Sequence, residues 1–65
     1  MNQNTELPPK ERAARYRAMA HDAMRNADRF SSARMKEGYR LMAKGWLRLA
    51  DEAEALDRKL RDLRA

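Results

Sequence analysis

The chain has no cysteine, no valine and no isoleucine among its 65 residues, and only two glycines and two prolines. Without cysteine, neither a disulfide nor a thiolate metal site can form. The missing β-branched apolar residues remove most of the strand preference, whereas the abundant Ala, Leu, Met, Arg, Lys and Glu favour helix. These absences predict an all-α protein, short enough that one chain buries only a marginal core.

Long hydrophobic runs are also absent. The opening residues 1–6 are polar and have no apolar segment of the kind found in a secretory signal peptide. No stretch approaches the roughly 18 apolar residues that a membrane-spanning helix requires. We therefore expect a cytoplasmic protein that does not act in a membrane. Its 43% hydrophobic and 38% charged residues are typical of a folded helical domain.

Residues suited to catalysis or metal binding are scarce. His21 is the only histidine, and it lies beside Asp22 but away from any candidate nucleophile. Asp51, Glu54 and Asp57 follow one helix face but lack the Glu-x-x-His pairing of carboxylate metal bundles. No glycine-rich phosphate loop is present. The sequence thus predicts a protein that is not an enzyme and has no cofactor, metal or small-molecule ligand.

What the chain does contain is a regular apolar rhythm in each half. In the second half, apolar residues recur at alternating steps of four and three, which is typical of a helix whose seam faces another helix. These are Met35, Tyr39, Met42, Trp46, Leu49, Ala53, Leu56, Leu60 and Leu63. The first half has a shorter seam of the same kind, rich in alanine: Ala13, Tyr16, Ala20, Ala23, Ala27 and Phe30.

The two rhythms are out of phase, which indicates a turn between two helices. Pro8 and Pro9 suit the first turn of a helix. Near the phase change, Ser31 is a suitable N-cap, and Phe30 and Met35 have the spacing of a hydrophobic staple. Because no Gly or Pro marks this turn, a single kinked helix is the alternative to a hairpin.

We predict that residues 1–7 form a disordered leader and that residues 8–65 form a single domain. In that domain, helices over about 8–29 and 32–63 pack as an antiparallel hairpin. A turn about Ser31 sets residues opposite each other when their numbers sum to about 62. The resulting pairs are Ala13 with Leu49, Tyr16 with Trp46, Ala20 with Met42, Ala23 with Tyr39, and Ala27 with Met35. Small side chains facing large ones would fill this interface without voids.

The hairpin predicted in this way is unequal, and its longer helix leaves three leucines uncovered. Leu56, Leu60 and Leu63 continue the seam past the start of the first helix, and such exposed apolar residues favour association. Small residues beside the seam widen the face that could be buried: Gly38, Ala43, Gly45 and Ala50. We therefore expect a homodimer that forms a coiled-coil-like four-helix bundle. The alternative is that residues 55–65 fray and the small residues alone support the dimer.

The net charge of +5 raises a second possible function. The stretch from Lys10 to Arg48 holds eleven basic and four acidic residues. Within it, basic residues step by four along the second helix: Lys36, Arg40, Lys44 and Arg48. Such a surface could follow a phosphate backbone. We interpret the chain as a non-enzymatic interaction or scaffold protein, and a small nucleic-acid-associated protein is the alternative.

One stretch also resembles a known type of protein. Residues 39–54 read Y-x-x-x-A-x-x-W-x-x-L-A-x-x-A-E, a pattern similar to that of small helical proteins of rhizobial and related alphaproteobacteria. Those proteins also have a preceding helix rich in Tyr, Arg and Ala. Gly45 stands here where an acidic residue or Gln is usual, and Phe30-Ser31-Ser32 replaces an acidic turn. The resemblance implies a bacterial cytoplasmic protein and supplies no function.

Overall fold

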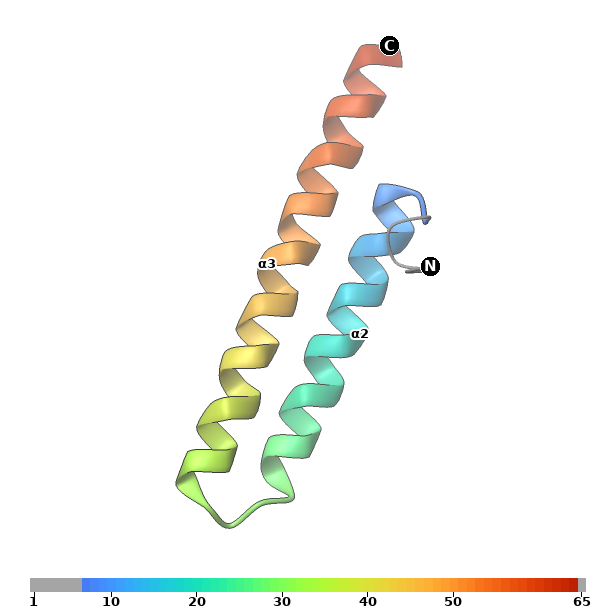
Figure 1. The fold of residues 1–65 in the computed structure, drawn as a ribbon. Helices are drawn as coiled ribbons and strands as arrows, with labels where there is room; N and C mark the ends of the chain where they lie inside the picture. The colour runs from blue at the N-terminus through green and yellow to red at the C-terminus, as the bar shows by residue number, and fades with distance from the viewer. Residues whose placement is uncertain (1–6, 65) are drawn as a thin grey trace.

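The computed structural model describes residues 7–64 and contains two helices joined by a short turn (Figure 1). Helix α2 runs from Pro9 to Asp28 and helix α3 from Ala33 to Arg64. They lie side by side and antiparallel, which confirms the all-α hairpin and excludes one continuous helix over these residues. Apart from Leu7, the expected leader lies outside the described residues. Neither helix is long and apolar enough to cross a membrane.

Helix α2 begins where its prolines require it. Pro9 occupies the first turn, where its missing N–H leaves no partner unsatisfied, and the backbone N–H of Arg12 donates to the Pro8 carbonyl at 2.9 Å. The Arg12 guanidinium also donates to the Leu7 carbonyl at 3.2 Å, which ties the preceding residue to the helix. Glu11 in the first turn and Arg25 in the last complement the helix dipole.

Helix α3 starts one residue later than the capping signal suggested. The cap is Ser32 and not Ser31, since the Met35 N–H donates to the Ser32 hydroxyl at 3.4 Å. The expected staple of Phe30 against Met35 is accordingly displaced. Phe30 instead stacks on Tyr39, with ring centroids 5.3 Å apart and planes at 13°. An aromatic ring one turn further along α3 offers Phe30 more contact area than a methionine at the helix start.

The register of the hairpin agrees with the sequence prediction. Tyr16 and Trp46 stack with centroids 5.8 Å apart and planes at 19°. Buried residues on either side of this pair keep the same alignment, with Ala13 near Ala50 and Ala20 near Ala43. The turn therefore fixes the helices in the expected antiparallel register, to within one residue.

The composition of the core differs from the prediction. Its fully buried side chains are all alanines: Ala13, Ala20, Ala23, Ala27, Ala43, Ala50 and Ala53. Met42 and Leu49, expected to face Ala20 and Ala13, are 51% and 38% exposed. Facing alanines allow a close approach of the helices, and close approach turns the larger side chains of α3 to the outside. The expectation that large side chains would interlock with alanines inside the hairpin was wrong for Met42, Leu49 and Met35.

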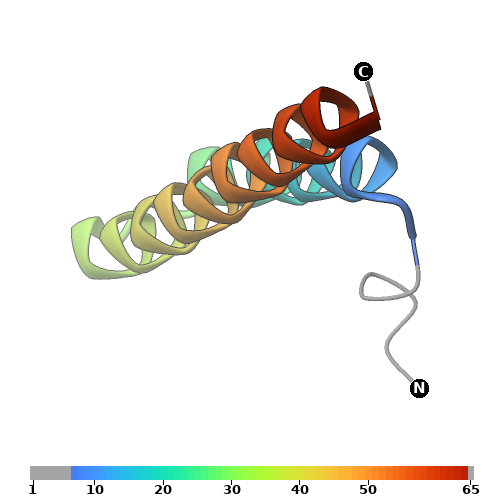
Figure 2. The same cartoon turned by 90° about the horizontal axis from the view of Figure 1, so that it is seen from above.

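The molecule is elongated, with extents of 50 × 22 × 14 Å and a radius of gyration of 14.3 Å. A compact chain of this length would have a radius of gyration of about 11 Å. Figure 1 shows that α3 continues well past the first turn of α2, and Figure 2 shows that the two helices form a single layer. The overhang expected from the sequence is therefore present, and α3 stays helical through it.

Candidate interaction surface

The strongest candidate site is a stripe of exposed apolar residues along α3, next to the side that contacts α2. We call it the apolar face, and it consists of Met35, Gly38, Met42, Gly45, Leu49, Leu56, Leu60 and Leu63. The six large side chains in this set are between 36% and 83% exposed. Their spacing in steps of three, four and seven keeps them in one row on a helix.

Two shallow depressions lie on or beside the apolar face. The first, of about 240 Å³, is lined by Met35, Gly38, Tyr39 and Met42, with Arg34 at its edge. These four positions are i, i+3, i+4 and i+7 of one helix, the arrangement that receives a side chain from a second helix in knobs-into-holes packing. Its lining is mostly apolar, as such packing requires.

The second depression has the same spacing of α3 residues about four turns further along the helix. It also has a volume of about 240 Å³, and its α3 lining is Leu49, Glu52, Ala53 and Leu56, again at i, i+3, i+4 and i+7. Tyr16 and Arg12 of α2 complete its wall. The Arg12 Nε is buried without a hydrogen-bond partner. The first depression thus lies on α3 alone, whereas the second lies in the groove between the two helices, beside the apolar face.

The glycines of the apolar face are not explained by contacts within the chain. A Cβ built on Gly38 or on Gly45 would have no neighbouring atom within 4 Å. Neither glycine has a positive φ, so neither backbone conformation requires glycine. Glycine inside a helix costs about 1 kcal/mol relative to alanine. Their presence in the apolar face is understandable if another backbone approaches there.

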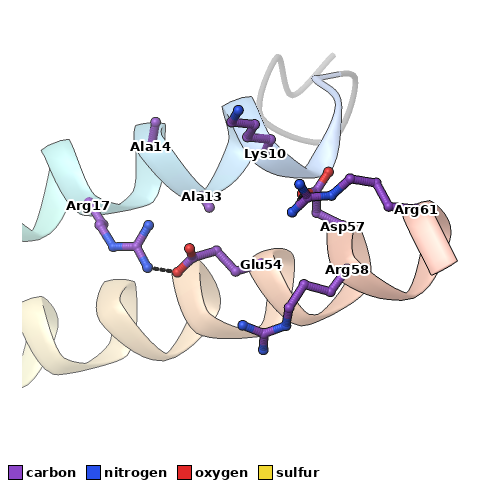
Figure 3. A pocket seen from close by; sticks show the side chains of 8 residues that line it. All are labelled: Lys10, Ala13, Ala14, Arg17, Glu54, Asp57, Arg58 and Arg61. Carbon is purple, nitrogen blue, oxygen red and sulfur yellow. Dashed lines mark ion pairs between the residues drawn. The ribbon is translucent and has the colours of Figure 1, made fainter.

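The opposite edge of the hairpin is charged. A pocket of about 330 Å³ lies where the start of α2 meets the last third of α3. Figure 3 shows the charged side chains that line it. Arg17 pairs with Glu54 across the two helices and lies 3.7 Å from Asp51, while Arg61 pairs with Asp57 at 2.7 Å. These ion pairs between largely exposed groups contribute little stability, at most about 1 kcal/mol each. The Arg17 contacts link the two helices, the Arg61 pair lies within α3, and together they make this edge hydrophilic.

The structure separates the residues that the sequence grouped into one seam. Tyr16, Ala20, Ala23, Tyr39 and Trp46 lie between the two helices, buried or half-buried. Met35, Met42, Leu49, Leu56, Leu60 and Leu63 lie on the apolar face. Sequence reasoning did not assign Ala43 and Ala50 to the core; their own step of seven, with Ala53 three residues later, was the available signal.

The basic residues proposed for nucleic-acid binding do not form one compact patch. Arg40, Lys44 and Arg48 are exposed and Lys36 is partly covered. Because a step of four advances the position by 40° around a helix, the row winds across the outer side of α3. His21 is exposed on α2, and no group of three or more potential metal ligands occurs among residues 7–64.

The chain matches no protein-family model, and neither the curated proteins nor the solved structures contain a significant match to it. The motif of residues 39–54 nevertheless has a simple physical role in this fold. Tyr39, Ala43, Trp46, Ala50 and Ala53 all contribute to the contact between the helices. Its final Glu54 pairs with Arg17. The motif residues therefore form the side of α3 that packs against α2.

Proposed function

We propose that this protein is a non-enzymatic helical interaction module that self-associates through the apolar face of α3. The observation that carries the proposal is the inverted distribution of side chains: alanines fill the inside of the hairpin and large apolar residues cover the outside. Burial of a large apolar side chain is worth about 1.5–3 kcal/mol, several times what an alanine methyl contributes. Covering the apolar face would therefore add substantially to the hydrophobic stabilisation that a single chain obtains.

The exposed area supports the same proposal. A compact protein of 7.6 kDa exposes about 4,300 Å², whereas this chain exposes 5355 Å². The difference of about 1,000 Å² is close to the roughly 800 Å² that each partner buries in an interface of standard size. Two hairpins in contact through the apolar face would form a four-helix bundle. We propose a cytoplasmic homodimer of this kind that serves as a scaffold.

Sedimentation equilibrium of two matched variants tests this function. Leu49→Glu places a charge in the centre of the apolar face, and Leu47→Glu makes the same change at a leucine that is 46% exposed on another side of α3. We expect the wild type and Leu47→Glu to sediment as dimers and Leu49→Glu to sediment as a monomer. A monomeric wild type at tens of micromolar, or equal behaviour of the two variants, would refute the proposal.

A second candidate function is binding to nucleic acid through the outer side of α3. The observation in its favour is that Arg40, Lys44 and Arg48 are exposed and form no ion pair within the described part of the chain. Titration of generic duplex DNA distinguishes this function, since phosphate contacts give affinity that falls steeply as salt rises. An absence of binding at about 50 mM salt removes this candidate.

A further inference from the structure

Apart from Gly45, the apolar face is symmetric about one residue, Leu49. Met42 and Leu56 each lie seven positions from it, Gly38 and Leu60 eleven, and Met35 and Leu63 fourteen. A row with this symmetry matches a second copy of itself when the two helices run in opposite directions and cross at the central residue. Residues whose numbers sum to 98 then lie opposite each other.

Building on the proposed self-association, we propose that α3 pairs with α3 of a second copy in antiparallel orientation, centred on Leu49. In this arrangement Leu60 of one chain lies opposite Gly38 of the other. Gly38 forms part of the first depression on the apolar face, where the chain leaves open space. The leucine is the knob and this depression is its hole. The overhang of each chain thus covers the turn-proximal end of the other.

The charges beside the apolar face favour the antiparallel orientation. The part of α3 before Leu49 carries five basic residues and one acidic residue, and the part after it carries five acidic and four basic residues. A parallel pair would place the two strongly basic parts together, whereas the antiparallel pair places each beside a slightly acidic one. Long-range repulsion between the chains is therefore lower in the antiparallel pair.

One specific charge pair supports the same register. Arg48 and Glu52 flank Leu49 on the edge of the apolar face away from α2, and both are exposed with no ion pair in residues 7–64. In an antiparallel pair with its two-fold axis at Leu49, the same edge of both helices lies on one side of the contact, so residues of that edge can meet across it. Arg48 of each chain then meets Glu52 of the other. A parallel pair would place these two edges on opposite sides of the contact, where Arg48 and Glu52 could not meet.

The glycines of the apolar face also fit the antiparallel orientation. In a parallel pair Gly38 would face Gly38 and Gly45 would face Gly45. That arrangement would leave two layers without side chains and would not fill the depression at Gly38. The antiparallel register instead gives Gly38 a larger partner, Leu60.

Disulfide trapping tests the orientation directly, because the natural chain has no cysteine. Single variants Met42→Cys, Leu56→Cys, Leu49→Cys and Leu47→Cys are made in the full chain and oxidised, alone and after co-refolding in pairs. A disulfide requires Cα atoms within about 7 Å of each other. We expect Leu49→Cys to cross-link with itself, and Met42→Cys to cross-link with Leu56→Cys but not with itself. Leu47→Cys serves as the control and should remain uncross-linked.

The outcomes separate this inference from the proposed function. Efficient cross-linking of Met42→Cys with itself would establish a parallel pair and overturn the antiparallel register while leaving self-association intact. A dimer by sedimentation in which Met42→Cys and Leu56→Cys fail to combine would also overturn it. A monomeric wild type would refute the proposed function, and the register with it.

Discussion

The side of α3 that packs against α2 and the apolar face beside it differ in composition and in exposure to water. The side facing α2 is made of small residues and two partly buried rings, Tyr39 and Trp46, and it is closed within one chain. The apolar face next to it is made of methionines, leucines and glycines, and it is open. The first side determines how the chain folds back on itself. The second side leaves six large apolar side chains partly in water, so we infer that folding and association are coupled.

The largest loss of stability should follow from truncating Trp46, which lies between these two sides of α3. Trp46 stacks on Tyr16 and is the largest side chain between the helices. Truncation of a tryptophan typically costs about 3–5 kcal/mol, which is comparable to the whole stability of a small domain. We expect Trp46→Ala to lose its cooperative thermal transition in circular dichroism, and Trp46→Phe to keep it. Melting of Trp46→Ala at the wild-type temperature would show that this ring does not hold the hairpin together.

The next largest effect should come from the overhang. Leu56, Leu60 and Leu63 are 40%, 36% and 83% exposed in one chain, so a partner could add about 2–5 kcal/mol per chain by covering them. Replacement of all three with Gln should weaken the dimer and make the melting temperature strongly dependent on concentration.

Light scattering on a chain ending at Ala55 provides the complementary measurement. If that truncated chain stays dimeric with unchanged unfolding, the overhang contributes nothing and Gly38, Gly45 and their neighbours carry the association. A truncated chain that is monomeric would assign the overhang its expected role.

Enlarging a residue on the side of α3 that packs against α2 should destabilise the fold by an intermediate amount. Ala50 has no exposed surface, and a larger side chain there must push the helices apart, at a cost of about 1–3 kcal/mol. Ala50→Leu should therefore unfold at lower urea concentration than the wild type. Ala18→Leu is the matched control, because Ala18 is exposed on α2. Equal denaturation midpoints for the two variants would mean that the alanine contact tolerates expansion.

The smallest effect should come from filling the depression at Gly38 on the apolar face, which should weaken the dimer. Gly38→Leu occupies the space assigned to Leu60 of the partner and should weaken the dimer about tenfold. The double variant Gly38→Leu with Leu60→Ala restores a large-against-small pair and should recover most of the affinity. Sedimentation equilibrium measures both dissociation constants. If Leu60→Ala does not rescue Gly38→Leu, the two residues are not neighbours across the interface.

The sequence predicted the hairpin, its register and the overhang because each depends on a local or periodic signal. Pro8 and Pro9, the phase change near residue 30 and the unequal seams are all visible without coordinates. The division of α3 into a closed and an open side was not predicted. Ala43 and Met42 are adjacent in sequence, and the heptad pattern allows either one to face α2. Only the close approach permitted by four alanines of α2 decides between them.

The capping residue was missed by one position for a similar reason. Ser31 and Ser32 are equally good N-caps by chemistry. The choice depends on Phe30 reaching Tyr39, a contact across the turn that periodicity does not reveal. Helix ends are therefore the least certain part of such a prediction.

Because the single tryptophan lies beside the apolar face, its fluorescence should report whether the protein is associated. Trp46 lies between the closed side and the apolar face, partly buried in one chain and one helical turn from both Met42 and Leu49. A second hairpin on that face would remove water from the indole, and an indole in apolar surroundings emits at shorter wavelength. Dilution of the unmodified protein should then shift its fluorescence to the red, and the concentration at the midpoint of that shift would report the dissociation constant without a label.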